Sequence, residues 1–97
     1  MTETAADALD RLERLIADVP EPYEMTHTAA RRLLIRATRE APASAALSVA
    51  IDEFHAHLHY MTLNMELYGR DQIDLAAYQD NCRAALRTVM AICRMVN

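Results

Sequence analysis

Apolar residues form two long rows on either side of Gly69, and in each row they recur at alternating spacings of three and four residues. This spacing is typical of a helix that buries one narrow face, whereas a half-buried strand alternates at every second residue. The first row contains Leu47, Ile51, Phe54, Leu58, Met61, Met65 and Tyr68, and the second contains Leu75, Tyr78, Cys82, Ala85, Val89, Ile92 and Val96. The pattern predicts two long helices, at about 44–68 and 71–96.

The two rows are mirror images of each other about the hinge at Gly69. Tyr68 pairs with Leu75, and Leu47 pairs with Val96 at the far end, so one antiparallel alignment matches every apolar layer. The sequence therefore predicts a long helical hairpin. Gly69 is expected to supply the left-handed residue that commonly follows a helix.

The first 42 residues predict two shorter helices. Leu9, Leu12, Ile16 and Val19 make one face of a helix that Thr2 or Thr4 can cap and that Pro20 and Pro22 end. A second helix starts at Thr26 or Thr28, buries Ala30, Leu33, Leu34 and Ala37, and runs to about Glu40, before Pro42. We expect an all-α, four-helix-bundle-like fold in a single domain of residues 1–97, with short helices in 1–42 and the hairpin in 43–97.

The predicted helix at 44–68 carries a second apolar stripe opposite the first. Its members are Val49, Ala56, Tyr60, Leu63 and Leu67. Because the helix at 71–96 can cover only one face, the second must meet the short helices, a second copy or another protein. Either the short helices complete a monomeric bundle, or an obligate partner does; we favour a homodimer, because the short helices cannot cover long ones fully.

The helix at 71–96 carries a row of small side chains that would let another helix approach closely. Ala77, Ala84 and Ala91 recur at every seventh residue. The sequence therefore predicts a partner-binding or dimer surface made of Val49, Tyr60, Leu63, Leu67, Ala77, Ala84 and Ala91.

Composition supports closely packed helices. Of the 97 residues, 53% are hydrophobic, with no Trp and a single Phe, so the core must consist of aliphatic side chains and Ala. All ten basic residues are Arg, which together with the many Ala indicates a GC-rich, and thus bacterial, genome.

Charge and segment composition exclude several function classes. The net charge of −4 argues against nonspecific binding to nucleic acid or to a membrane surface. No export signal or membrane span is evident, so a cytoplasmic protein is expected. Cys82 and Cys93 would lie about 16 Å apart along one helix, too far to bond to each other, and buried reduced thiols fit that compartment.

Three potential metal ligands converge on one face of the predicted helix at 44–68. His55 and His59 are one turn apart, and Asp52 precedes His55 by three residues. Zinc or another transition metal could bind there, although no fourth ligand is evident. We favour solvated or interface histidines with no cofactor, and keep a metal-binding bundle as the alternative.

Other chemistry has little support in the sequence. No serine or cysteine stands in a context that marks an activated nucleophile, and the single glycine precludes a phosphate-binding loop, so we do not expect an enzyme. One basic row, Arg32, Arg36 and Arg39, is expected to neighbour the acidic first helix. A second row, Arg83, Arg87 and Arg94, either engages an acidic partner surface or faces solvent.

These features together predict a protein that works by binding another protein. The description fits a regulator, an anti-activator, an adaptor or an immunity-type inhibitor. Methionine side chains could make the binding surface pliable. They are Met61, Met65, Met90 and Met95.

Overall fold

The computed structural model describes residues 4–95, and these residues form an all-α structure without any strand. Its elements are α1 (Ala5–Asp18), α2 (Tyr23–Ala37), α3 (Ala45–Tyr68), the short 3₁₀ helix η1 (Arg70–Gln72) and α4 (Leu75–Met95). The prediction of an all-α fold with two short and two long helices is confirmed.

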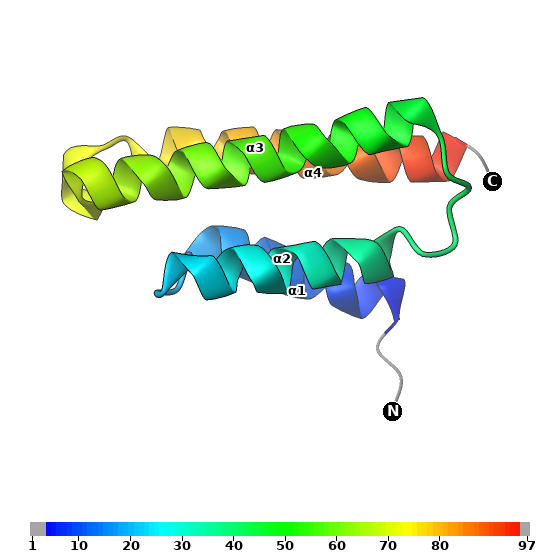
Figure 1. Ribbon diagram of the computed structural model, residues 1–97, viewed down its shortest axis with the longest axis horizontal. Coiled ribbons are helices and arrows are strands. Elements are labelled where there is room, and N and C mark those ends of the chain that lie inside the picture. The colour runs from blue at the N-terminus through cyan, green and yellow to red at the C-terminus, as the bar shows by residue number, and fades with distance from the viewer. Residues whose placement is uncertain (1–3, 96–97) are drawn as a thin grey trace.

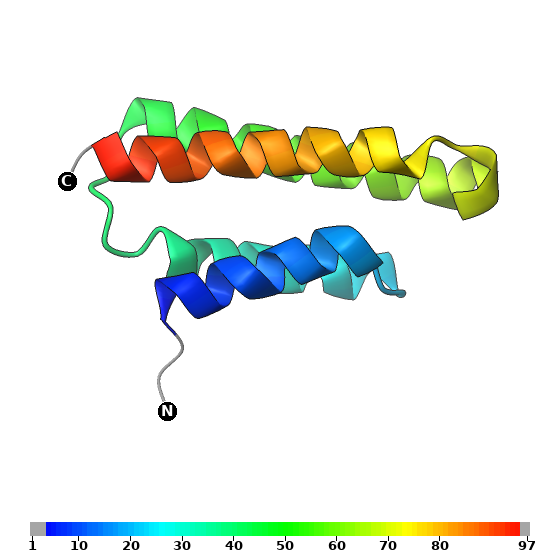
Figure 2. The same ribbon diagram turned by 180° about the vertical axis from the view of Figure 1, so that it is seen from behind.

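The four helices form two layers, each of which is a pair of antiparallel helices. Figures 1 and 2 show α1 and α2 side by side in one layer and α3 and α4 side by side in the other. Between the layers, α2 contacts α3 and α1 contacts α4, and each helix runs opposite to the one before it in the chain. The short helices thus cover one side of the α3–α4 pair.

The two layers differ in length. With a rise of 1.5 Å per residue, α3 is about 36 Å long, whereas α1 and α2 are about 21 and 22 Å long. The α3–α4 pair therefore extends beyond α1 and α2 at the end that carries Gly69 and η1 (Figure 1). There it has no second layer beneath it.

The core contains side chains from all four helices. Leu12, Leu34, Phe54 and Val89 are each at most 1% exposed. Most of the two predicted apolar rows is buried or half-buried, although Val96 lies outside the described residues. The expected burial of Tyr68 is wrong: this side chain is 61% exposed, because it lies at the projecting end.

Two helix starts follow directly from their capping residues. The Thr4 hydroxyl accepts a hydrogen bond from the Asp7 amide at 3.1 Å, and the Asp7 carboxylate accepts one from the Thr4 amide. These hydrogen bonds lower the pKa of Asp7. Ser44 accepts a hydrogen bond from the Leu47 amide at 3.1 Å and so begins α3, as its position in the sequence predicts.

Two other helix starts differ from the prediction. The second helix begins at Tyr23, directly after Pro22, and the Thr26 hydroxyl donates back to the Pro20 carbonyl at 2.6 Å instead of capping the helix. The fourth helix begins at Leu75, not at Asp71. The Asp74 carboxylate accepts a hydrogen bond from the Ala77 amide at 3.3 Å, and the residues before Asp74 form η1.

Gly69 ends α3 in a conformation that suits glycine. Its φ is +85° and its ψ is 151°, and its amide donates to the Met65 carbonyl at 2.9 Å. The expected positive φ is present, but ψ places the residue in an extended region that is almost exclusive to glycine.

Two side chains from the other layer bind the carboxyl end of α1. Gln79 of α4 donates to the carbonyls of Ile16 at 3.0 Å and Ala17 at 2.9 Å. Arg70 of η1 donates to the carbonyls of Asp18 and Val19. These carbonyls have no hydrogen-bond partner within α1. The Gln79 and Arg70 side chains therefore supply the hydrogen bonds that the end of α1 lacks.

Candidate functional site

The second apolar stripe of α3 faces solvent. Val49 is 56% exposed, Tyr60 is 57% exposed and Leu67 is 64% exposed, while Leu63 is 37% exposed and Ala56 is exposed as well. The opposite side of α3 contributes Phe54, which is completely buried. Helices α1 and α2 lie on the buried side, so they leave the second stripe uncovered.

The row of small residues on α4 is also exposed. Ala77, Ala84 and Ala91 all face solvent, while Cys82 and Val89 on the same helix are fully buried. The rings of Tyr60 and Tyr78 lie 5.8 Å apart and connect the exposed side of α3 to α4. We call the two sets of side chains the outer face: Val49, Ala56, Tyr60, Leu63 and Leu67 of α3 with Ala77, Ala84 and Ala91 of α4.

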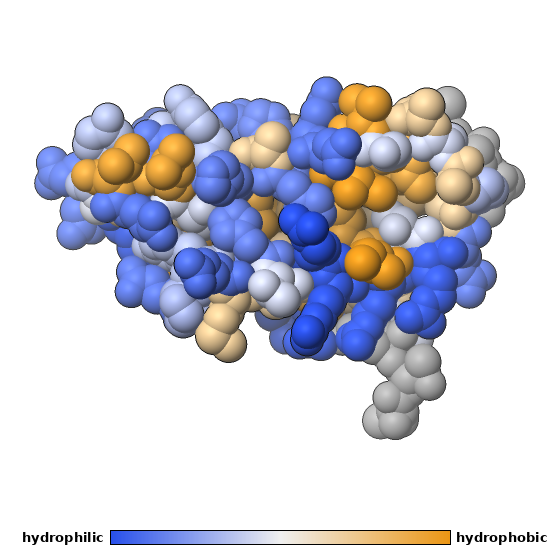
Figure 3. Space-filling model, in the orientation of Figure 1, coloured by the Kyte–Doolittle hydropathy of each residue, from blue (hydrophilic) through white to orange (hydrophobic). Residues whose placement is uncertain are grey.

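The outer face continues onto the projecting end of α3. Figure 3 shows apolar surface at this end, surrounded by hydrophilic side chains. The segment that projects carries Leu67 and Tyr68, both more than 60% exposed. Large apolar side chains thus remain in solvent where the second layer is missing.

Two histidines of α3, His55 and His59, lie beside α2 and not on the outer face. His59 is exposed, and its ring centre is 5.7 Å from that of His27 on α2. His27 Nε2 lies 2.8 Å from the Thr62 hydroxyl. His55 is half-buried, with its ring 5.6 Å from that of Phe54, and lines a small hollow with Arg31 of α2 and Asp52.

Sequence reasoning did not identify His27 as part of this cluster. It lies within the stretch where the second helix was expected to begin, so no face could be assigned to it. The helix begins at Tyr23, three residues before Thr26, so His27 lies within its second turn and contacts Thr62 of α3.

Both interface histidines are harder to protonate than a free imidazole. Burial lowers the pKa of His27, and the neighbouring His59 and Arg31 lower it further, against the effect of Glu66. Burial also lowers the pKa of His55, assisted by Arg31 and opposed by Asp52. His27 and His55 are therefore mostly neutral near pH 7.

The cluster does not form a metal-binding arrangement. Within residues 4–95, no three His, Cys, Asp or Glu side chains are grouped so that they could hold a metal ion. Asp52, His55 and His59 are therefore not brought together as a ligand set. Arg31 places a positive charge beside His55, which disfavours a cation there.

The two thiols are buried, and neither forms a disulfide. Burial raises the pKa of the Cys82 thiol to about 11, and it raises the pKa of Cys93 as well. A nucleophilic cysteine needs an accessible thiolate with a lowered pKa. The Cys82 thiol is buried and its pKa is raised, so it meets neither condition.

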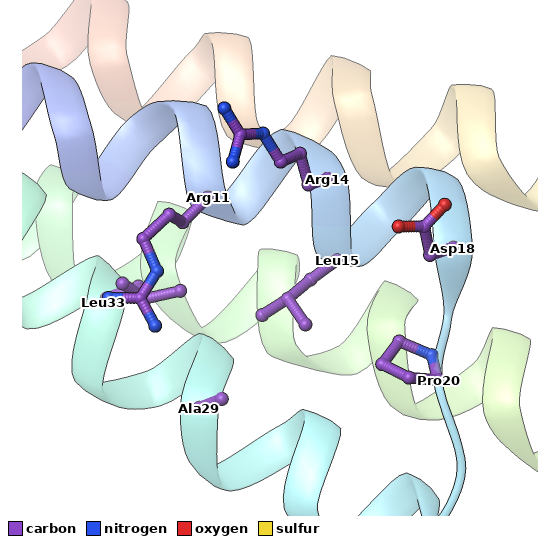
Figure 4. A pocket seen from close by; sticks show the side chains of 7 residues that line it. All are labelled: Arg11, Arg14, Leu15, Asp18, Pro20, Ala29 and Leu33. Carbon is purple, nitrogen blue, oxygen red and sulfur yellow. The ribbon is translucent and has the colours of Figure 1, made fainter.

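A shallow hollow lies between α1 and α2 (Figure 4). It has a volume of about 230 Å³, with Leu15 at its centre, Arg11 beside Leu33 at one end, and Asp18 with Pro20 at the other. This volume is below the 300–1,000 Å³ typical of small-molecule sites. The arginines expected to neighbour the acidic first helix are exposed: Arg32 and Arg36 on α2, and Arg39 just after its end.

Comparisons with known proteins add no further evidence. No protein-family profile, curated protein or solved structure matches this chain. Within the described residues, no helix is both long enough and apolar enough to span a membrane.

Proposed function

We propose that this chain is a non-enzymatic protein-binding module that forms a homodimer through the outer face of α3 and α4. Roles as a regulator, an anti-activator, an adaptor or an immunity-type inhibitor all fit such a module. A cytoplasmic location accords with its two buried thiols, which form no disulfide.

The observation that carries this proposal is the uncovered second stripe of α3. Val49, Tyr60 and Leu67 are each more than half exposed and follow one another along one side of a single helix. Scattered apolar side chains are ordinary on a protein surface, but a contiguous set is typical of an interaction surface. The small side chains beside it on α4 would let a helix approach closely.

The size of the outer face fits a second copy of the chain. Two helices about 10 Å apart, α3 about 36 Å long and α4 about 32 Å long, present a face of roughly 700 Å². A stable interface buries about 800 Å² on each partner. None of the eight residues that define the outer face is charged, while Glu53 and Asp80 lie one turn from its members at the edge of the face.

The arrangement of α4 also suits a two-fold axis. Ala77 and Ala91 are equally distant in sequence from Ala84, so an antiparallel pair of α4 helices that crosses at Ala84 would place Ala77 opposite Ala91. Small side chains of one copy would then lie opposite small side chains of the other.

Light scattering on a charged variant tests this proposal. We expect the unmodified protein to have twice the 10.9 kDa mass of the chain, and Leu67→Glu or Leu63→Glu to have the mass of one chain with its helical circular dichroism retained. Ile35→Glu is the matched control, because Ile35 is 61% exposed on α2, away from the outer face. An unchanged mass for both leucine variants, or a monomeric unmodified protein, would refute the proposed dimer.

A further inference from the structure

An apolar groove with basic residues along one side lies between α1 and α4. Its volume is about 400 Å³. Leu9 and Glu13 line it from α1, and Arg83, Leu86, Arg87, Met90, Ala91 and Arg94 line it from α4. Because α1 and α4 have a limited contact with each other, the groove lies along the junction of the two layers.

The floor of the groove is apolar and partly accessible. Leu86 is almost completely buried, while Leu9 and Met90 are half-buried beside it. Such side chains could accept an apolar stripe from another molecule. Ala91 belongs both to this groove and to the outer face, so the two surfaces adjoin along α4.

Positive charge lines the α4 side of the groove. The Arg83 guanidinium donates a hydrogen bond to the Asp80 carboxylate at 3.1 Å, and the two side chains form an ion pair. Arg87 and Arg94 are exposed, and among the described residues neither has an ion-pair partner. Glu13 is the one carboxylate among the residues that line the groove, so the groove is basic in a chain whose net charge is −4.

We propose that this groove binds an acidic amphipathic helix of a partner protein. The span from Arg83 to Arg94 covers about 16 Å along α4, or three helical turns. A docked helix with its apolar stripe on Leu9 and Met90 would place two carboxylates, two turns apart, beside Arg87 and Arg94. A ligand with a single carboxylate would satisfy only one of these guanidinium groups.

This inference deepens the proposed function, because it rests on the chain being a protein-binding module and assigns the partner a chemistry. It does not depend on the dimer. The groove is lined by α1 and one side of α4, while the dimer requires the outer face of α3 and α4. The two surfaces can therefore be tested by separate variants.

Fluorescence anisotropy with a synthetic peptide tests the groove. The probe is a fluorescein-labelled 18-residue peptide with leucines at heptad spacing and glutamates beside them, and its counterpart carries glutamines in place of the glutamates. We expect the acidic peptide to bind at least about tenfold more tightly than the neutral one. We also expect Arg87→Glu with Arg94→Glu to weaken that binding at least about tenfold.

A matched control separates the groove from general electrostatic attraction. Arg32→Glu with Arg39→Glu makes the same change of charge at exposed positions on α2 and just after its end, and binding should stay within about twofold. Equal loss in both double variants, equal binding of the two peptides, or no binding would each overturn the proposal. Binding of dodecanoate without binding of the peptide would overturn it in favour of a small carboxylate ligand.

The same samples keep the two proposals distinguishable. Binding of the peptide to the monomeric Leu67→Glu variant would support the groove regardless of the dimer. A peptide that fails to bind a protein of twice the chain mass would refute the groove and leave the dimer intact.

Discussion

Gly69 has the backbone conformation on which the turn after α3 depends. At φ +85° and ψ 151°, an L side chain is strained, although a Cβ there would meet no atom within 4 Å. We therefore expect Gly69→Ala to lower the free energy of unfolding by about 1–3 kcal/mol through backbone strain alone. Urea denaturation measures the change. Chemically synthesised protein with D-alanine at position 69 should retain its stability, since a D-residue favours positive φ; equal losses for both residues would refute strain as the cause.

Gln79 connects the two layers through the carbonyls of Ile16 and Ala17. Replacing it by alanine removes two hydrogen bonds to the end of α1, where the Ala17 carbonyl can still reach water. We expect Gln79→Ala to lower the free energy of unfolding by about 1–2 kcal/mol in urea denaturation. Asn81→Ala is the control, because Asn81 is exposed on the same helix; an equal effect of both variants would contradict this role of Gln79.

At the scale of the helix, the alanine row of α4 allows the close approach of two copies to be tested with a bulky side chain. If two copies pack across Ala84, a bulky residue there will separate them, and because Ala84 is exposed the folded chain has room for it. We expect Ala84→Trp to raise the dimer dissociation constant at least about tenfold in sedimentation equilibrium, with unchanged thermal unfolding of the monomer. Ala76→Trp adds the same side chain at an exposed position off the row. It should leave the dissociation constant unchanged, and equal effects would contradict close approach along the row.

Sequence patterns predicted the helices better than their ends. Periodicity located all four helices, because burial of one face requires it. Ends were predictable where one strong cap stands alone, as with Ser44. They were not predictable at Asp71 and Asp74, because either carboxylate can cap a helix and only packing selects between them.

The candidate surfaces were predictable to different degrees. The exposed stripe of α3 could be predicted because the helix has two apolar sides and therefore needs two neighbours, of which α4 supplies only one. The place of His27 beside His59, and the groove beside Arg87, depend on how α1 and α2 lie against the long hairpin. Contacts between helices distant in sequence leave no local pattern, so they were not visible.

The whole molecule consists of two helical pairs with a narrower junction between them. The contacts within each pair are more extensive than those of α2 with α3 and of α1 with α4. Gln79 and Arg70 cross this junction at one end of α1, and His27 crosses it to Thr62. Conditions that change the charge of His27 should therefore act on the association of the two layers.

Acid should weaken the folded molecule through this junction. Folding lowers the pKa values of His27 and His55 from about 6.5, the value for a histidine in the unfolded chain. Once the pH falls below about 6.5, the unfolded chain therefore binds more protons at these two residues than the folded chain does. Their stabilising contribution is full above that pH and declines as pH falls toward the folded pKa values, below which the loss is complete. Protonation of His27 or His55 would also place a positive charge beside Arg31 and, for His27, beside His59. The carboxylates of Glu66, near His27, and of Asp52, near His55, offset part of this unfavourable interaction.

Urea denaturation at about pH 7.5 and pH 5.5 measures this loss, in a range above the titration of ordinary carboxylates. We expect the unfolding midpoint to fall between these pH values, and to fall less in His27→Gln, which can still hydrogen-bond the Thr62 hydroxyl without taking up a proton. His57→Gln removes an exposed histidine of α3 and should lose as much stability as the unmodified protein. Parallel losses in all three proteins would contradict a role for His27, because the loss would then come from groups outside the junction between the two layers.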